Sequence, residues 1–133
     1  MKANELRIWN YVRFYATESI ITAINNNDEE NSYVDVASYN DIPIEDLNPI
    51  PLTEDWLLKF GFEKEIDEFD IFSIHNSQYS IQHYKNGKCI FVYSPINELN
   101  PEDEENVIFL QIKHVHQLQN LYFALTGEEL TIK

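Results

Sequence analysis

Hydrophobic and polar residues alternate near the start of the chain. Over residues 6–15 one set of alternate positions is hydrophobic, namely Leu6, Ile8, Val12 and Phe14. The intervening positions hold Arg7, Trp9, Tyr11 and Arg13. A period of two is typical of a half-buried β-strand, so the second set is expected to face outward. Two further β-rich runs, at 19–24 and 33–37, predict that this strand belongs to a small sheet.

A short helix is predicted after a proline-rich connection. Residues 40–52 contain three prolines and are expected to be extended and irregular. Thr53 then suits a helix N-cap, because two acidic residues follow it at the positive end of the helix dipole. Gly61 suits the left-handed residue that ends a helix.

The second half of the chain is predicted to be mostly antiparallel. Residues 78–94 contain Asn86-Gly87, the preferred pair for a two-residue type I′ hairpin turn. In that register one face of the hairpin holds Tyr79, Ile81, Ile90 and Val92. The other holds Ser80, Gln82, Tyr84, Cys89, Phe91 and Tyr93. The nearly continuous hydrophobic run 107–112 predicts a central strand that is covered on both sides.

The stretch HVHQLQNLYFALTG, residues 114–127, predicts a helix that contains no Lys, Arg, Asp or Glu. Its hydrophobic residues recur at helical spacing and should anchor it: Val115, Leu118, Tyr122 and Leu125. A flank of the helix holds His116, Gln119, Asn120 and Phe123. Because a solvated helix normally carries charge, this flank is expected to be removed from water, by the same chain, a second copy or a ligand. Residues 129–133 are expected to add a short edge strand.

These elements predict an α+β fold. We expect an N-terminal small twisted β-sheet or SH3-like half-barrel, a short linking helix, and then an antiparallel sheet with one packed C-terminal helix. The 133 residues suffice for a single compact domain, with lobes at 1–52 and 53–133 and a seam in the stretch 42–52. Polar connections are expected at 25–32 and 97–106.

The charge of the chain restricts its partners. The formal net charge is −14, so binding to duplex nucleic acid or to an acidic membrane surface is disfavoured. One cysteine excludes an internal disulfide framework. No run is long enough for a transmembrane helix, and the first residues lack the apolar core of a signal peptide. A cytoplasmic protein is therefore expected.

Common catalytic motifs are missing from the sequence. The three glycines form neither a phosphate-binding loop nor a nucleophile elbow. Cys89 lies in a predicted strand, where a buried structural role is expected. His114 and His116 are two residues apart on a predicted helix, which separates their side chains and disfavours a shared metal. We expect no cofactor, no metal site and no catalytic residue.

Three stretches resemble a known family: KANELRIWNYV at 2–12, NPIPLTEDWLLKFGF at 48–62 and HVHQLQNLYFALTGEEL at 114–130. The family comprises short uncharacterised proteins encoded in Bacteroidetes prophages and mobile elements. At the start, such proteins tend to read Leu-Arg-Ile-Gly-Asn-Tyr-Val, and here Trp9 stands where the glycine would be. The resemblance implies a host-interaction role, such as an inhibitor or a sequestering protein.

The leading functional hypothesis is a non-catalytic binding protein that captures a host protein or a small anionic, nucleotide-like ligand. Candidate binding or interface residues lie on three surfaces: Arg7, Trp9, Tyr11 and Arg13; Gln82, Tyr84, Phe91 and Tyr93; His116, Gln119 and Asn120. A homodimer through the third surface is an alternative. Two other functions stay open, a small hydrolase or nuclease that uses a metal or carboxylates, and an acidic mimic of nucleic acid.

Overall fold

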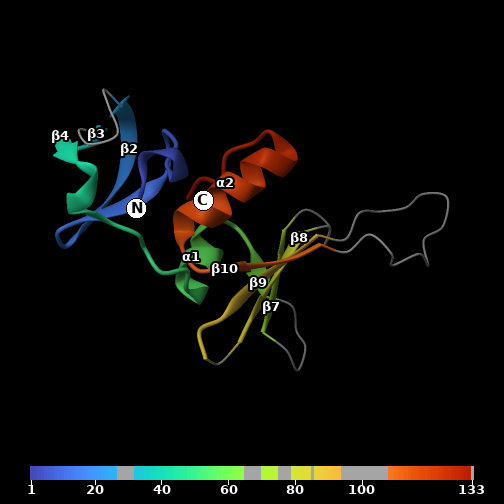
Figure 1. The fold of residues 1–133 in the computed structure, drawn as a ribbon. Coiled ribbons are helices and arrows are strands. Elements are labelled where there is room, and N and C mark those ends of the chain that lie inside the picture. Colours follow the sequence, from blue (N-terminus) through green and yellow to red (C-terminus); the bar gives the residue numbers. More distant parts are fainter. Residues whose placement is uncertain (27–31, 65–69, 75–78, 85, 94–107, 133) are drawn as a thin grey trace. The chain divides into compact units, whose positions relative to one another are not determined.

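The computed structural model of this protein describes residues 1–26, 32–64, 70–74, 79–84, 86–93 and 108–132 (Figure 1). Its contacts divide the chain into two compact units. The first unit comprises Met1–Pro51 and His114–Leu130, and the second comprises Leu52–Lys113 and Thr131–Lys133. The predicted α+β class is confirmed, with one antiparallel sheet in each unit. The polar connections expected at 25–32 and 97–106 lie mostly outside the described residues.

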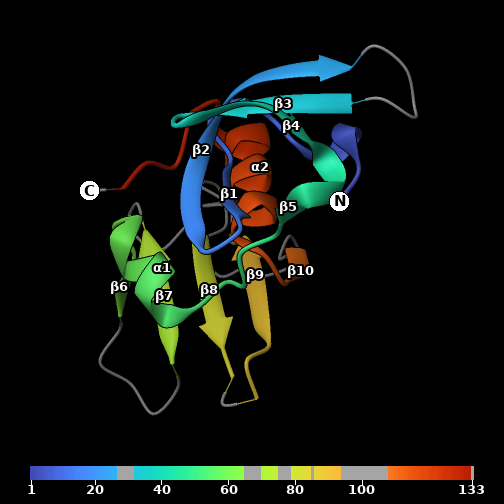
Figure 2. The same ribbon diagram turned by 90° about the vertical axis from the view of Figure 1, so that its left-hand side faces the viewer.

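The first unit contains a curled, half-barrel sheet with strand order β4-β3-β2-β1-β5. Its elements are η1 (Ala3–Glu5), β1 (Tyr11–Phe14), β2 (Thr17–Asn26), β3 (Ser32–Val36), β4 (Tyr39–Pro43), η2 (Ile44–Asp46), β5 (Leu47–Asn48) and α2 (Val115–Thr126). Each described pair of neighbouring strands is antiparallel. Figure 2 shows helix α2 running behind β1, and the two elements are in contact.

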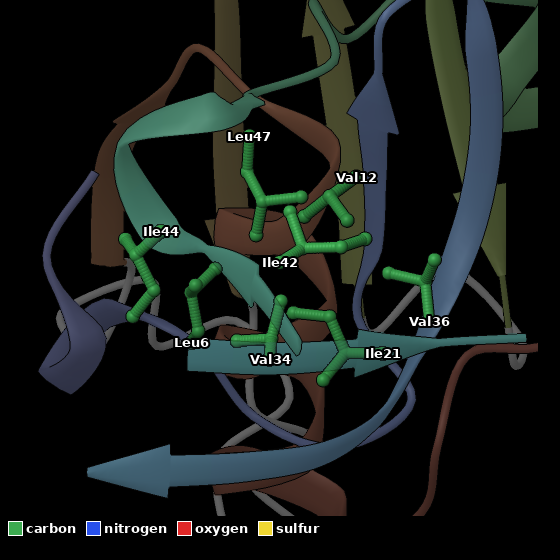
Figure 3. Packing of buried hydrophobic residues seen from close by; sticks show 8 residues of the cluster. All are labelled: Leu6, Val12, Ile21, Val34, Val36, Ile42, Ile44 and Leu47. Atoms are coloured by element: carbon green, nitrogen blue, oxygen red, sulfur yellow. The ribbon is translucent and has the colours of Figure 1, made fainter. Parts of the chain in front are cut away.

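Aliphatic side chains fill the concave side of this sheet. The cluster comprises Leu6, Val12, Ile21, Val34, Val36, Ile42, Ile44 and Leu47, and these side chains point toward one another (Figure 3). Val12, Ile21 and Val34 are fully buried. Burying a side chain of this kind contributes about 1.5–3 kcal/mol, so the cluster adds substantially to the unit's stability.

Two sequence predictions for this unit are wrong. The strand expected over 6–15 begins only at Tyr11, and Ile8, which was assigned to the core, is 45% exposed. The chain turns before Tyr11, and this turn breaks the alternation of faces. The stretch 40–52, expected to be irregular, contributes β4 and β5 to the sheet. Two of its prolines, Pro49 and Pro51, lie beyond β5.

The second unit contains a sheet with strand order β10-β9-β8-β7-β6. Its elements are α1 (Glu54–Lys59), β6 (Glu63–Lys64), β7 (Ile71–Ile74), β8 (Tyr79–His83), β9 (Cys89–Tyr93) and β10 (Ile108–Ile112). The predicted helix is confirmed, and the Thr53 side chain caps it by accepting a hydrogen bond from Trp56 N. Gly61 has a φ of 90°, as expected for the residue that ends it.

The hairpin between β8 and β9 is confirmed, but its predicted register is wrong by one residue. Tyr84 N donates to Lys88 O at 2.8 Å, and Gly87 N donates to Tyr84 O at 2.9 Å. The loop is therefore one residue longer than a type I′ turn, with Gly87 at a φ of 87°. Because side chains alternate between the two faces of a strand, a shift of one residue pairs each face of β8 with the opposite face of β9 from the one predicted. Ile81 lies opposite Phe91, and both are fully buried.

The predictions for the ends of the second sheet also need correction. Strand β10 was expected to be central, but among the described strands it lies at an edge. Its Leu110 is 43% exposed. No strand forms over the described residues 129–132.

The C-terminal helix α2 is confirmed, with Gly127 as its left-handed C-cap at a φ of 74°. Val115, Leu118 and Tyr122 are buried as predicted. Leu125 is 38% exposed, so its assignment as an anchor is wrong. Helix α2 ends one residue after Leu125, where the hydrophobic stripe no longer meets the sheet.

Candidate functional site

A tight turn over residues 7–10 precedes β1, and we call it the Trp9 turn. Asn10 N donates to Arg7 O at 3.1 Å, which closes the turn. The Asn10 side chain is fully buried and its Oδ1 accepts from Arg7 N at 2.7 Å. Trp9 N donates to Ile21 O at 2.8 Å, and Ile21 N donates to Asn10 O at 2.9 Å. The backbone of the turn is thereby fixed to β2.

Trp9 has a φ of 81°, in the left-handed region that side chains disfavour. It occupies the third position of the turn, where a positive φ is normally supplied by glycine. A bulky residue in this conformation is strained by about 1–2 kcal/mol. More than half of this residue stays in water, because Trp9 is 57% exposed.

Gln119 of α2 binds the backbone at the end of this turn, on both sides of Asn10. The Gln119 side chain is fully buried. Its Nε2 donates to Trp9 O at 3.0 Å, and its Oε1 accepts from Tyr11 N at 2.9 Å. A single neutral amide thus satisfies one backbone acceptor and one backbone donor, which a charged side chain could not do. This explains why an uncharged polar residue stands at this position.

Asn120 connects the same turn to the first residues of the chain. Its Oδ1 accepts from Asn10 Nδ2 at 2.9 Å and from Arg7 Nη1 at 3.0 Å. Its Nδ2 donates to Glu5 O at 2.8 Å. The Arg7 guanidinium also pairs with the Glu129 carboxylate. We call Arg7, Asn10, Gln119, Asn120 and Glu129 the polar network.

The flank of α2 is therefore removed from water largely by its own chain. Gln119 and His116 are buried, and Asn120 is half-buried. Phe123 remains 39% exposed, with the Arg7 guanidinium 4.0 Å from the centre of its ring. The flank was expected to be covered by the same chain, by a second copy or by a ligand. In the structure, residues of the same chain cover its buried part.

The first candidate surface, Arg7, Trp9, Tyr11 and Arg13, is not a continuous stripe. Arg7 and Trp9 belong to the turn, whereas Tyr11 and Arg13 belong to β1. Arg13 forms an ion pair with Glu18 at 3.2 Å. Both arginines consequently face carboxylates of the same chain.

The second candidate surface, Gln82, Tyr84, Phe91 and Tyr93, is divided between two faces of the second sheet. Gln82 lies opposite Ile90, so it does not share a face with Phe91. Phe91 is fully buried and belongs to the core. Tyr84 is 44% exposed, and its hydroxyl donates to Gln82 Oε1 at 3.1 Å. Tyr93 lies on β9 opposite Tyr79.

The groups considered for catalysis are placed as follows. Cys89 is buried and burial raises the pKa of its thiol to about 11, so the thiolate is scarce at neutral pH. Within the described ranges, no group of three or more His, Cys, Asp or Glu side chains is arranged to hold a metal ion.

In those same ranges, no helix has both the length and the apolar character needed to cross a membrane.

The sequence analysis did not identify Asn10 and Glu129 as members of the polar network. It also did not predict that Ile8 is exposed. The alternating pattern concealed the turn, because neither glycine nor proline marks it. The available signal was Asn10 itself, since asparagine commonly bonds to nearby backbone in turns. Glu129 gave no local signal, because its partner Arg7 is distant in sequence.

No protein-family model, curated protein or solved structure matches this chain.

Proposed function

We propose that this protein is a non-catalytic binding protein whose first unit captures a protein partner, with Trp9 as the anchor. One observation carries the proposal: Trp9 is 57% exposed at a φ of 81°, so neither packing nor backbone preference accounts for it. Strained residues held in place by their surroundings are concentrated at functional sites.

A protein partner is favoured over a small anionic ligand by the charges around the turn. Arg7 is paired with Glu129 and Arg13 with Glu18, so neither guanidinium is offered to an anion. The exposed groups at the turn are instead the apolar Ile8 and Trp9. Tryptophan is enriched among the residues that dominate the energy of protein interfaces.

The polar network supports this role because it makes the turn rigid before binding. Gln119 and Asn10 fix the backbone on both sides of Trp9. A side chain that is already ordered loses less conformational freedom when a partner binds it. The resemblance to proteins of prophages and mobile elements favours a host protein as the partner.

The test compares tagged wild type with Trp9→Gly in quantitative affinity capture at pH 7.5 from the cells that encode the protein. Tyr15→Gly is the matched control: Tyr15 is 78% exposed, but its positive φ of 53° is explained by the two-residue hairpin turn between β1 and β2. We expect a partner to be enriched by wild type and Tyr15→Gly and lost by Trp9→Gly. Equal enrichment by Trp9→Gly and wild type would contradict the proposal.

A further inference from the structure

His116 is a buried ionisable residue in the first turn of α2. It is 1% exposed, and within the described part of the chain neither of its ring nitrogens has a hydrogen-bond partner. A neutral imidazole tolerates such a site better than the cation, which carries two donors and a full charge. The first turn of a helix also disfavours a cation, because the helix dipole is positive there.

The charged and titratable groups around His116 come from three elements. The expectation that His114 and His116 are separated is wrong, because His114 is the N-cap that precedes α2 and not a helical residue. Its ring stacks on the His116 ring at 5.8 Å between centres and an angle of 9°. Glu5 of η1 and the amino terminus also act on His116. Strand β1, which packs against α2, carries Tyr11 and Arg13, and the charge of Arg13 is paired with Glu18. Glu5 is the one group among these that acts to favour the cation.

Burial lowers the pKa of His116, and His114 and the amino terminus act in the same direction, whereas Glu5 opposes them. The unfolded chain keeps the ordinary pKa of about 6.5. Below that pH the unfolded state binds a proton that the folded state does not. The stability contributed by neutral His116 is therefore complete above about pH 6.5 and is lost as the pH falls from there toward the folded pKa.

We propose that His116 is an acid switch: its protonation favours the state in which α2 is detached from the sheet of the first unit and the Trp9 turn is released. Gln119 and Asn120, which hold the turn, lie about one helical turn after His116. Detaching α2 removes both of them from the turn. That acid would also release a bound partner rests on the proposed function. The acid sensitivity of α2 docking does not rest on it.

The experiment measures urea unfolding of each unit at pH 7.5 and 5.0. Trp9 and Trp56 lie in different units, so fluorine NMR of protein labelled with 5-fluorotryptophan reports the two unfolding transitions separately. Wild type is compared with His116→Leu, which fills the site with a neutral side chain. His83→Leu, in the second unit, is the control.

For the first unit, acidification should lower the folding equilibrium constant more in wild type than in His116→Leu. The upper limit of this difference is about 30-fold, the value for a histidine that binds its proton only when unfolded. The control should behave like wild type. Equal acid sensitivity of wild type and His116→Leu, within about 3-fold, overturns the proposal.

A direct titration of wild type covers the case in which His116→Leu does not fold. The His116 imidazole, followed by carbon NMR, should titrate below pH 6.5 while the first unit remains folded. Titration of the folded protein near pH 6.5 overturns the switch. Neither result affects the capture experiment with Trp9→Gly, which is performed at pH 7.5.

Discussion

Replacement of Gln119 by alanine should destabilise the first unit by about 2–4 kcal/mol. The substitution leaves Trp9 O and Tyr11 N without their partner. An unpaired buried group costs about 1–3 kcal/mol. Both hydrogen bonds are only partly buried, so the lower half of that range applies to each group. The sum is a large share of the 5–15 kcal/mol that is typical of a whole domain.

The assay is urea unfolding followed by the fluorine signal of labelled Trp9, which reports the first unit. Gln117→Ala is the matched control, because Gln117 has the same side chain on the same helix but is exposed. Its Oε1 accepts from His114 N at 3.0 Å, a bond that water can replace, so the loss should stay below about 1 kcal/mol. If Gln119→Ala costs no more than Gln117→Ala, our explanation of the uncharged helix is refuted.

Other side chains give further predictions. Native Cys89 should react with iodoacetamide at pH 8 about 100-fold more slowly than in urea, because a pKa of about 11 rather than 9.0 leaves a hundredth of the thiolate. Leu118→Ala should cost about 2–5 kcal/mol in urea unfolding and Leu125→Ala less than about 1, since only Leu118 is buried. Gly127→Ala should cost about 1 kcal/mol in the same assay, from its φ of 74° and not from a clash.

Local patterns predicted the elements whose signals lie within a few residues. Thr53 and Gly61 marked the ends of α1, and Gly127 marked the end of α2. The hairpin of the second sheet was found from Asn86-Gly87. Its register was not, because the same pair also suits a longer loop in which Gly87 takes a positive φ and Asn86 does not.

The candidate site could be predicted only in part, since it depends on contacts between distant segments. The missing charge on α2 correctly indicated that His116 and Gln119 are withdrawn from water, but Asn120 is only half-buried and Phe123 is 39% exposed. The partners of Gln119 and Asn120, at Trp9 and Asn10, are about 110 residues away, and no local pattern specifies such a pairing.

The free energy of unfolding of the first unit in Trp9→Gly tests most directly whether Trp9 serves binding and not folding. Glycine relieves a left-handed strain of about 1–2 kcal/mol but adds about 0.4–1 kcal/mol of freedom to the unfolded chain. We predict that Trp9→Gly is within about 1 kcal/mol of wild type and more stable than Trp9→Ala, which keeps the strain. Amide NMR signals of Val12, Ile21 and Val34 report the unfolding. A loss above about 2 kcal/mol in Trp9→Gly would make Trp9 a structural residue and contradict the account.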